Sequence, residues 1–493
     1  MKSNLNYNIY AIMALYSVFL FGENKNLIII NKKNVIHKFV PYDEPTDHFT
    51  KNVFQNWEND TFAIFDQVKD PEGIAIDIGA WIGTTAIWLS KNFKHVLAID
   101  ADKISLDCLQ KNLIASECSN VAICSQPVAQ TAQRVVFGPR GTELNESISY
   151  IKPQADKSDD YTIQAITFKQ LIHDYVYTNE KYNSHSISFI KCDIEGGEEN
   201  ILEDILYFSY YNKIKVYLSF HLEWWKSKKI TDFEYLFKFF KTNCPHSNLI
   251  EYLQKNPWAS VLFEPLDTAE TLIKKNIPVV IIGYNQVSYI KNMVSQIEKY
   301  TSDIIVIDNN STYQPLLDYY KNEFSYSLLR QKANLGSSVY TQGFVQNLVG
   351  DVFLLTDPDL QFNANLPENF IQQLINISDY FHAHRVGFAL EIDSENIRTD
   401  VKFYGFSIKE WEQRFWKRKL IYPINTQMEL YKADIDTTFA LHNKKYPSGV
   451  HIRVAGNFTC LHLPWYNNFK SKLQPDEYEF YMQHNISTNW FKH

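Results

Sequence analysis

In the first half of this chain, short apolar runs of strand length alternate with segments whose apolar residues have the spacing of a helix. Residues 74–78 form an apolar run rich in β-branched side chains, residues 84–89 carry apolar side chains at helical spacing, and residues 95–99 form a second apolar run. Strand-length runs that alternate with a helix are typical of a parallel sheet. The pattern therefore predicts a β–α–β unit, with Gly79 after its first strand and Asp100 after its second.

The same alternation continues on both sides of this unit. Residues 27–30 and 35–40 are predicted to form a β-hairpin, and neither strand carries visible chemistry. Downstream, a helix is expected over residues 104–116 and a strand over residues 120–124. The first half of the chain is therefore predicted to be an α/β domain.

A second α/β pattern starts abruptly after residue 277. Residues 278–283, 303–307 and 351–355 are apolar runs of strand length, and residues 288–300 have helical spacing. This pattern again predicts strands that alternate with helices, so we expect a second α/β domain.

Length and composition agree with two domains. The chain has 493 residues, of which 45% are hydrophobic, and this is enough for two full cores. The polar stretch 262–277 contains a proline and interrupts the apolar periodicity, so we place the boundary there. We expect one domain at residues 1–265, with its core at about 73–225, and a second domain at residues 277–493.

Charge, cysteines and the N-terminal residues exclude some functions. The formal net charge of -8 provides no basic field, so no nucleic-acid partner is expected. The six cysteines are scattered without a C-x-x-C pair, which is typical of a reducing compartment and argues against structural zinc. The apolar run at residues 9–22 is too short to span a bilayer. We expect a cytoplasmic protein without stable membrane insertion, and a signal peptide or shallow anchor is the alternative.

The turn after the first strand carries a chemical signal. It reads Asp77-Ile-Gly79-Ala-Trp-Ile-Gly83, with a glycine spacing that differs from the G-x-G-x-x-G loop that seats a pyrophosphate, and it adds an acid. A carboxylate at Asp77 suits a ligand with a positive end, such as the amino or sulfonium group of S-adenosylmethionine. Asp100 stands where an acid accepts both ribose hydroxyls. A buried turn whose glycines only permit tight packing is the alternative, but the combination favours a nucleoside ligand.

A second group of acids follows the apolar strand that ends at Cys192. Asp193 and Glu195 are two residues apart, so in an extended chain their side chains point the same way, at the sheet edge where α/β folds bind ligands. They are suited to orient an acceptor hydroxyl, to take its proton or to hold a cation. Glu198 and Glu199 are expected only to favour the positive end of the helix that follows.

Residues 73–225 resemble FkbM-type methyltransferases, a branch of the class I S-adenosylmethionine-dependent fold, which is Rossmann-like. The resemblance lies in the stretches AIDIGAWIGTTA, LAIDAD and FIKCDIEGGEENIL. Members of that family typically methylate hydroxyl groups, often on sugars or polyketide-derived scaffolds. The resemblance implies that S-adenosylmethionine is contacted by Asp77, Gly79, Gly83 and Asp100.

The same resemblance indicates which residues lie near the transferred methyl group. Asp193 is expected beside it, and His221, in the stretch SFHLEWW, is the candidate base. A structural histidine at the end of a strand is the alternative for His221. The signature of amino-methyltransferases, an Asn or Asp before two prolines and an aromatic residue, is absent from the sequence. This absence weakens a DNA base as the substrate.

Two acids are the main signal of the second half. Asp357 and Asp359 follow an apolar strand, and two extended carboxylates at this spacing can hold a hard divalent ion that keeps positions for water and phosphates. The ion would neutralise charge on a departing diphosphate. Surface turns also contain D-x-D, but the position after an apolar strand favours the metal.

Residues from about 277 to 490 resemble the glycosyltransferase type A fold of family 2-like glycosyltransferases. The resemblance lies in the stretches IPVVIIGYNQ, IIVIDNNST, KANLG and LLTDPDL. It implies that Mn²⁺ or Mg²⁺ is held by Asp357, Asp359 and His462. It also implies a nucleotide-sugar site that contains Tyr284, Asn285, Asp308, Asn334 and Gly336.

The base of this second reaction stays open. The stretch ADIDTTF offers Asp436 or Asp434, and we take Asp436 as the catalytic candidate. The common Glu-Asp pair is absent, so neither the base nor the stereochemical outcome follows from the sequence. Trp465 is suited to stack on a sugar ring, although an aromatic residue after a proline more often belongs to the core.

Together these patterns predict a bifunctional transferase. One domain would O-methylate a sugar or glycan with S-adenosylmethionine, and the other would transfer a sugar from a nucleotide-sugar donor to a glycan or sugar acceptor. One alternative is that a single domain is active and the other is a glycan-binding scaffold. A more remote alternative is that the first domain methylates a protein or a small metabolite.

Overall fold

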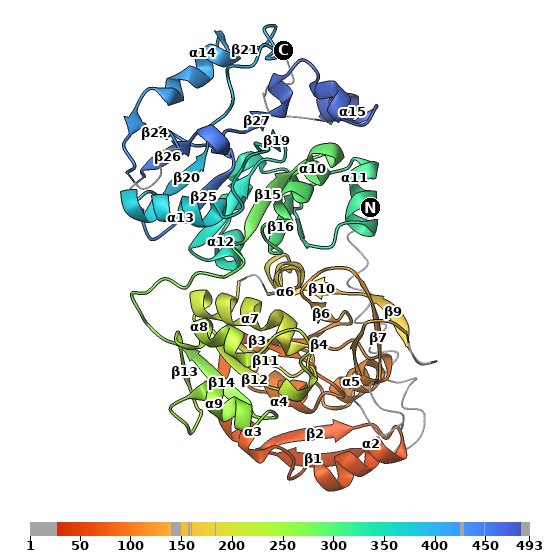
Figure 1. Ribbon diagram of the computed structural model, residues 1–493. Helices are drawn as coiled ribbons and strands as arrows, with labels where there is room; N and C mark the ends of the chain where they lie inside the picture. The colour runs from red at the N-terminus through yellow and green to blue at the C-terminus, as the bar shows by residue number, and fades with distance from the viewer. Residues whose placement is uncertain are drawn as a thin grey trace. The chain divides into compact units, whose positions relative to one another are not determined.

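The chain folds into two compact units, each with its own sheet and core (Figure 1). The computed structural model describes residues 27–139, 149–155, 158, 160–182, 184–423, 428–447 and 449–484. The apolar run predicted at 9–22 lies outside these residues. The first unit contains residues 1–129 and 134–266, and the second contains residues 130–133 and 267–493.

A mixed sheet forms the centre of the first unit. In the part of this unit that the structure describes, seven strands lie in the order β13-β14-β12-β11-β3-β4-β5. Neighbours from β12 to β5 run parallel, and β14 is antiparallel to both β12 and β13. Their bounds are β3 Asp70–Ile78, β4 Phe93–Ile99, β5 Val121–Cys124, β11 Ile187–Cys192, β12 Lys215–Ser219, β13 Phe240–Thr242 and β14 Ser260–Pro265.

The position of the first unit's ligand crevice follows from this order. The chain passes from β3 to β4 and β5 on one side and then returns to β11 and β12 on the other. In open α/β sheets ligands bind at such a reversal, outside the carboxyl ends of the strands. The residues that follow β3, β4 and β11 therefore border the expected site.

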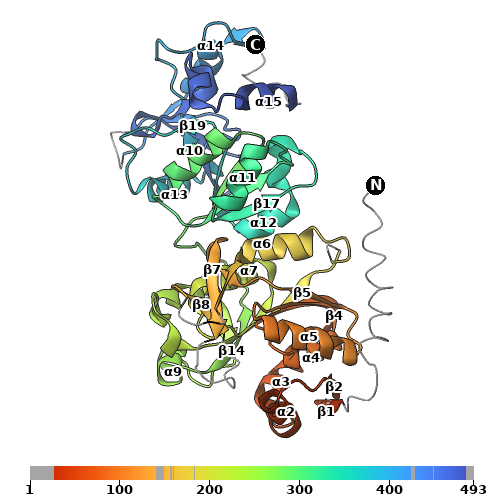
Figure 2. The ribbon, with the colours of Figure 1, turned by 90° about the vertical axis from the view of Figure 1, so that its right-hand side faces the viewer.

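The predicted β–α–β unit is confirmed at β3, α4 (Thr84–Ser90) and β4. Residues 74–78 of β3 are almost completely buried, as expected for a strand inside a parallel sheet. Helix α4 is buried along its whole length and packs against β3 and β4 (Figure 2). Asp102 caps the start of helix α5 (Lys103–Ala115), because its carboxylate accepts hydrogen bonds from two backbone N–H groups of the first turn.

Further elements surround this sheet. The predicted hairpin is confirmed as β1 (Ile28–Lys32) paired with β2 (Val35–Phe39). A small antiparallel sheet in the order β8-β7-β9 and a short parallel pair, β6 with β10, lie between β5 and β11 in the sequence. The bounds are α2 Glu44–His48, α3 Asn59–Phe65, β6 Val128–Ala129, β7 Arg134–Pro139, β8 Ser149–Lys152, β9 Tyr161–Gln164, β10 Ile166–Thr167, α6 Phe168–Ile172, α7 Glu198–Asn212, α8 Glu234–Phe237 and α9 Leu249–Lys255.

The second unit is built on a longer mixed sheet. Its described residues form nine strands in the order β17-β16-β15-β18-β25-β20-β26-β24-β23, in which β17, β16, β15 and β18 are parallel. The bounds are β15 Val279–Gly283, β16 Ile304–Asp308, β17 Ser327–Arg330, β18 Val352–Thr356, β20 Arg385–Phe388, β23 Lys419–Leu420, β24 Leu430–Lys432, β25 Ala440–Asn443 and β26 His451–Val454. The strand order reverses between β15 and β18, so the second crevice is expected there.

Helices and short strands complete the second unit. Helix α10 packs against β15 and α11 (Figure 1). Strand β19 (Leu360–Gln361) pairs with β27 (Leu461–His462) outside the main sheet. The helix bounds are α10 Val287–Ile297, α11 Gln314–Asn322, α12 Gly343–Val349, α13 Phe370–Phe381, α14 Ile408–Glu412 and α15 Glu477–His484. Among the described residues, no helix has the length and hydropathy needed to cross a bilayer.

Candidate active sites in the two units

The loop after β3 is shaped by close backbone contacts. Gly79 has a φ of 84°, and its N–H donates to the carbonyl of Ile99 at 2.9 Å. A Cβ at Gly79 would lie 1.8 Å from the carbonyl oxygen of Asp193, so only glycine fits here. Gly83 has a φ of 95° and immediately precedes α4. The two glycines therefore let the loop pass tightly between the ends of β4 and β11.

Asp77 lies inside the unit rather than in the crevice. Its side chain is completely buried, and its carboxylate lies 3.1 Å from the Nζ of Lys191 and accepts a 2.7 Å hydrogen bond from the hydroxyl of Thr85. Lys191 also donates to the carbonyl of Gly79 at 2.7 Å. Burial raises the pKa of Asp77, while the charge of Lys191 opposes that rise. Asp77 thus faces Lys191 in the structure, and its predicted contact with the positive end of a ligand stays a prediction.

Asp100, at the end of β4, is placed differently. Its two oxygens accept hydrogen bonds from the backbone N–H groups of Trp81 and Asp102, at 2.8 and 2.9 Å. Burial raises its pKa from 3.8 to about 6, and these hydrogen bonds limit the rise. The side chain is partly exposed. Each carboxylate oxygen keeps a further lone pair, so Asp100 can still accept hydroxyl donors.

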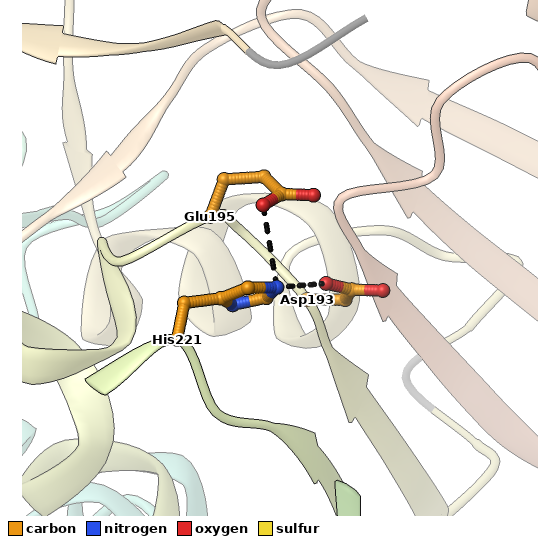
Figure 3. Close-up of side chains that lie close together, drawn as sticks. All are labelled: Asp193, Glu195 and His221. Atoms are coloured by element: carbon orange, nitrogen blue, oxygen red, sulfur yellow. Dashed lines mark ion pairs between the residues drawn. The ribbon is translucent and has the colours of Figure 1, made fainter. Parts of the chain in front are cut away.

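Three potential ligand groups meet at the end of β11 and β12 (Figure 3). The Nε2 of His221 lies 3.6 Å from Oδ1 of Asp193 and 3.2 Å from Oε2 of Glu195. Asp193 directly follows β11, and its backbone N–H donates to the carbonyl of Ile78. Glu195 has a φ of 56°, which turns the chain back toward His221. The structure therefore brings together the two acids and the histidine that were predicted separately.

Glu198 has a role that the sequence did not indicate. It is buried, accepts hydrogen bonds from the N–H groups of Ile194 and Gly196, and lies 2.9 Å from Nδ1 of His221. The prediction that Glu198 only favours the helix end was therefore incomplete. Glu199, in the same first turn of α7, accepts hydrogen bonds from three successive backbone N–H groups beginning at Lys226.

The carboxylates around His221 favour the positively charged form of its imidazole. Burial alone would lower its pKa, but the hydrogen bond and charge of Glu198, with the charges of Asp193 and Glu195, raise it to about 9. In this arrangement the imidazole already holds its proton at neutral pH. Its neighbours therefore favour the imidazolium form, and the predicted role of His221 as a base stays a prediction.

Tryptophan side chains flank the cluster. Trp224 stacks on His221 with ring centroids 5.4 Å apart, and Trp258 contacts both rings edge-on. Trp258 is 48% exposed, although large apolar side chains are usually buried. Sequence reasoning missed Trp258 and Lys191; only Lys191 gave a signal, as a lysine inside an apolar strand.

The second unit brings two of the three predicted metal ligands close together after β18. The pairing of β19 with β27 places Leu360 opposite His462, and Nε2 of His462 lies 3.3 Å from Oδ2 of Asp359. Oδ1 of Asp359 and Nδ1 of His462 are buried without a hydrogen-bond partner. Burial, and then the charge of Asp359, raise the pKa of Asp357, whose carboxylate also accepts a hydrogen bond from the Thr437 hydroxyl.

The two candidate bases lie in different surroundings. Asp436 accepts hydrogen bonds from the backbone N–H and the hydroxyl of Thr438, at 3.0 and 2.6 Å. Its charge contributes, after burial and Asp359, to the raised pKa of Asp357. Asp434 is 95% exposed and lies 3.8 Å from His451. Of the two acids, Asp436 is therefore the one near the candidate metal ligands.

Two of the predicted nucleotide residues have internal partners. Asp308 is fully buried, and its carboxylate accepts hydrogen bonds from the N–H of Ser311 and the side chains of Arg330 and Tyr320. Asn285 is also fully buried, and its side-chain oxygen accepts from two backbone N–H groups that begin at Thr312. Both side chains thus brace the loop after β16, and their predicted contact with a nucleotide stays a prediction.

The other predicted nucleotide residues lie nearer the surface. The hydroxyl of Tyr284 donates to the carbonyl of His484 at 2.9 Å, so Tyr284 is tied to the end of α15. Asn334 accepts a hydrogen bond from the N–H of Gly336, whose φ is 60° and whose Cβ position is open. Trp465 is only 2% exposed and belongs to the core, which excludes it as an exposed sugar platform.

Comparisons with solved structures give matches that cover less than half of this chain. An rRNA methylase from Streptococcus thermophilus has a TM-score of 0.26 and 12% identity over 42% of this chain and 96% of its own. A methyltransferase FkbM from Methylobacillus flagellatus KT has a TM-score of 0.26 and 18% identity over 45% of this chain and 55% of its own. A putative methyltransferase from Streptococcus mutans in complex with SAH has a TM-score of 0.25 and 13% identity over 46% of this chain and 100% of its own. A comparison with curated proteins gave no match.

Two family descriptions match separate parts of the sequence. Residues 77–243 match the methyltransferase FkbM domain, and residues 279–439 match glycosyl transferase family 2. The first match covers Asp100 and the group of Asp193, Glu195 and His221. The second runs from β15 to the residue before β25. The chain therefore carries an FkbM methyltransferase domain followed by a family 2 glycosyltransferase domain.

Proposed function

We propose that this chain is a bifunctional transferase of glycan assembly. Its first domain transfers a methyl group from S-adenosylmethionine to a hydroxyl group of a sugar or glycan. Its second domain transfers a sugar from a nucleotide-sugar donor to a glycan or sugar acceptor. One observation carries the proposal. In both the FkbM domain and the family 2 domain, the candidate site residues follow strands beside the point where the strand order of the sheet reverses.

The residues of the first domain suit S-adenosylmethionine. Asp100 keeps lone pairs for the ribose hydroxyls, and the tight loop from Gly79 to Gly83 leaves the backbone free to approach a ligand. Asp77 acts from inside by holding Lys191, which in turn holds the loop at the carbonyl of Gly79. S-adenosylmethionine supplies an electrophilic methyl group on a positively charged sulfur. The protein orients that group and the attacking hydroxyl.

The acceptor hydroxyl is expected beside Asp193 and Glu195. Both carboxylates are partly exposed and accept hydrogen bonds, so they can orient a hydroxyl and receive its proton. The exposed face of Trp258, next to Trp224, is suited to pack against the C–H face of a sugar ring. These aromatic side chains favour a sugar over a small charged metabolite as the acceptor.

The second domain suits a divalent cation, either Mn²⁺ or Mg²⁺. Oδ1 of Asp359 and Nδ1 of His462 are buried polar atoms without hydrogen-bond partners. A bound cation would give such oxygen and nitrogen atoms a partner. Asp357, Asp359 and His462 would hold it, and the ion would supply charge neutralisation for the departing nucleoside diphosphate. Asp436 is placed to orient the acceptor, and partly exposed Arg330 is suited to meet a phosphate.

The proposed location is the cytoplasm. All six cysteines are free, which is common in a reducing compartment, and two of the predicted substrate classes are intracellular cofactors. The alternative is that one domain is only a glycan-binding scaffold. In that case we expect only one of the two donor-derived ligands to bind.

Titration calorimetry on the intact protein tests the proposal. We expect one site for S-adenosylhomocysteine and one site for a nucleoside diphosphate that requires Mn²⁺. Asp100→Asn should weaken only the first, and the double substitution Asp357→Asn with Asp359→Asn should abolish only the second. Binding of one ligand class alone would leave the other domain as a scaffold. Incubation with both donors and a glycan acceptor, followed by mass spectrometry, then identifies the transferred groups.

A further inference from the structure

The group formed by Asp193, Glu195 and His221 has the geometry of a metal site. Among the described residues, it is the one set of three His, Cys, Asp or Glu side chains whose ligand atoms all lie within 4.8 Å of one another. Asp357, Asp359 and His462, which are also among the described residues, do not all lie this close together. We propose that Asp193, Glu195 and His221 bind a divalent cation in the methyltransferase domain.

The distances match the edges of a coordination shell. Ligands bound about 2.1 Å from one ion lie about 3.0 Å apart at neighbouring corners of an octahedron and about 3.4 Å apart in a tetrahedron. Nε2 of His221 lies 3.2 Å from Glu195 and 3.6 Å from Asp193. Figure 3 shows this nitrogen directed at both carboxylates. Small movements of the side chains, with loss of the Nε2 proton of His221 to water, would thus place all three ligands on one ion.

Glu198 provides a second, independent observation. Histidines that bind metals usually donate their other ring N–H to a carboxylate, which fixes the ring orientation. Nδ1 of His221 lies 2.9 Å from Oε1 of Glu198, a carboxylate that is 1% exposed and held by two backbone N–H groups. Glu198 is therefore a positioning residue that aims Nε2 at the two acids.

Charge and access fit the same conclusion. Oδ2 of Asp193 lies 3.9 Å from Lys191, while its other oxygen faces His221. Lys191 is also the partner of Asp77, so one lysine faces several carboxylates. The side chains of Asp193 and Glu195 are 22% and 31% exposed, whereas Glu198 behind them is closed to solvent. An ion can therefore enter from the side on which the acceptor is expected.

The ligand set indicates the class of ion and its role. Two carboxylates and one imidazole suit a first-row divalent ion such as Mn²⁺, with positions left for oxygen ligands. Resting on the proposed methyl transfer, the ion would bind the acceptor hydroxyl and lower its pKa. The proton would then leave to water instead of to Asp193 or Glu195, because their oxygens would hold the ion. The oxygen then attacks the methyl carbon, the C–S bond breaks with its electron pair on sulfur, and S-adenosylhomocysteine and a methyl ether remain.

Cobalt binding tests this site without any acceptor. The full chain, purified without a histidine tag, carries Asp357→Asn and Asp359→Asn so that the glycosyltransferase ligands cannot contribute. We expect one Co²⁺ per chain, with visible absorption bands of a nitrogen-ligated ion. His221→Gln or Glu195→Gln should lower the Co²⁺ affinity more than about 100-fold, and His221→Gln should remove the nitrogen-dependent bands.

Further variants separate a metal role from a structural one. Glu198→Gln should weaken Co²⁺ about 10- to 100-fold and shift its bands, because the charge behind the imidazole is lost. Glu203→Gln, on the same helix but outside the cluster, should change neither. Retained S-adenosylhomocysteine binding shows that each variant is folded. Absence of bound Co²⁺, or an affinity unchanged by both His221→Gln and Glu195→Gln, would overturn the site. Neither result depends on whether methyl transfer occurs.

Discussion

At the scale of single residues, buried charges in the first domain are held by specific partners. Asp77 is completely buried and Lys191 nearly so, and their charged groups lie 3.1 Å apart at the base of the loop before α4. Lys191 also binds the backbone of that loop at Gly79. A buried pair of this kind is costly to break from one side, because the remaining charge is left without a partner.

Removing one partner of this pair should therefore cost more than removing both. We expect Lys191→Met to lower the free energy of unfolding of the first domain by about 3–5 kcal/mol. Adding Asp77→Asn should recover part of this loss, because no unpaired charge remains. Urea unfolding of the four proteins of this cycle gives the coupling. Strictly additive losses would show that the two groups do not stabilise each other.

Asp100 leads to a pH prediction for cofactor binding. Its pKa in the free protein is about 6, because burial disfavours the carboxylate. Ribose hydroxyls donate to the ionised form, so protons compete with the ligand below pH 6 and have little effect above pH 7. We expect the affinity for S-adenosylhomocysteine to be level between pH 7 and 8 and to fall as the pH drops through 6.

The Asp100→Asn variant is the matched control for this pH dependence. It should bind S-adenosylhomocysteine roughly 10- to 100-fold more weakly, because hydrogen bonds to a charged acceptor are lost. Its affinity should also lose the fall around pH 6. If the variant keeps the same pH profile as the natural sequence, another group controls binding.

At the scale of elements, the sequence predicted strands and helices well and side-chain partners poorly. Apolar runs and glycines specify β3, α4 and β4 locally, so their bounds follow from neighbours in the chain. The partner of a strand-end acid comes from a distant strand. Asp77 meets Lys191 from β11, and no local pattern shows whether such an acid faces inward or outward.

The same limit applies to the polar residues of the second domain. Asp359 and His462 meet because β19 pairs with β27, whereas the resemblance implied only that His462 is a metal ligand. Asp308 and Asn285 were expected to face a nucleotide, but both satisfy nearby backbone groups from inside. A polar residue after a strand has both options, and only the packing of the following loop decides between them.

The contact between β3 and β11 gives a prediction at this scale. Gly79→Ala would place a methyl group 1.8 Å from the carbonyl of Asp193 at a positive φ, so the ends of both strands must separate. We expect a loss of at least about 2 kcal/mol in unfolding free energy and no measurable S-adenosylhomocysteine binding. Gly343→Ala, at the start of α12 with open space around its Cβ, is the control and should be nearly neutral.

Near-natural binding by Gly79→Ala would count against this account of the loop. It would mean that β11 can shift without disturbing Asp193, so the close approach would be incidental to the site.

At the scale of the whole molecule, each domain has a core of its own. One large cluster of buried side chains surrounds β3 and α4, and another surrounds β15, β18 and α10. The residues proposed for S-adenosylmethionine lie in one of these units, and those proposed for the nucleotide sugar lie in the other. A ligand that binds only the folded form of one domain raises the stability of that domain by mass action.

Calorimetric unfolding of the intact chain should therefore respond to the two ligands separately. At a concentration 100 times its dissociation constant, a ligand adds about 2.7 kcal/mol, or roughly 5–10 °C for a domain of this size. We expect S-adenosylhomocysteine to shift one transition, and a nucleoside diphosphate with Mn²⁺ to shift the other. Asp100→Asn should remove the first shift and leave the second. A single transition that both ligands raise equally would instead mean that the two cores unfold as one cooperative body, so that ligand binding in either domain stabilises both.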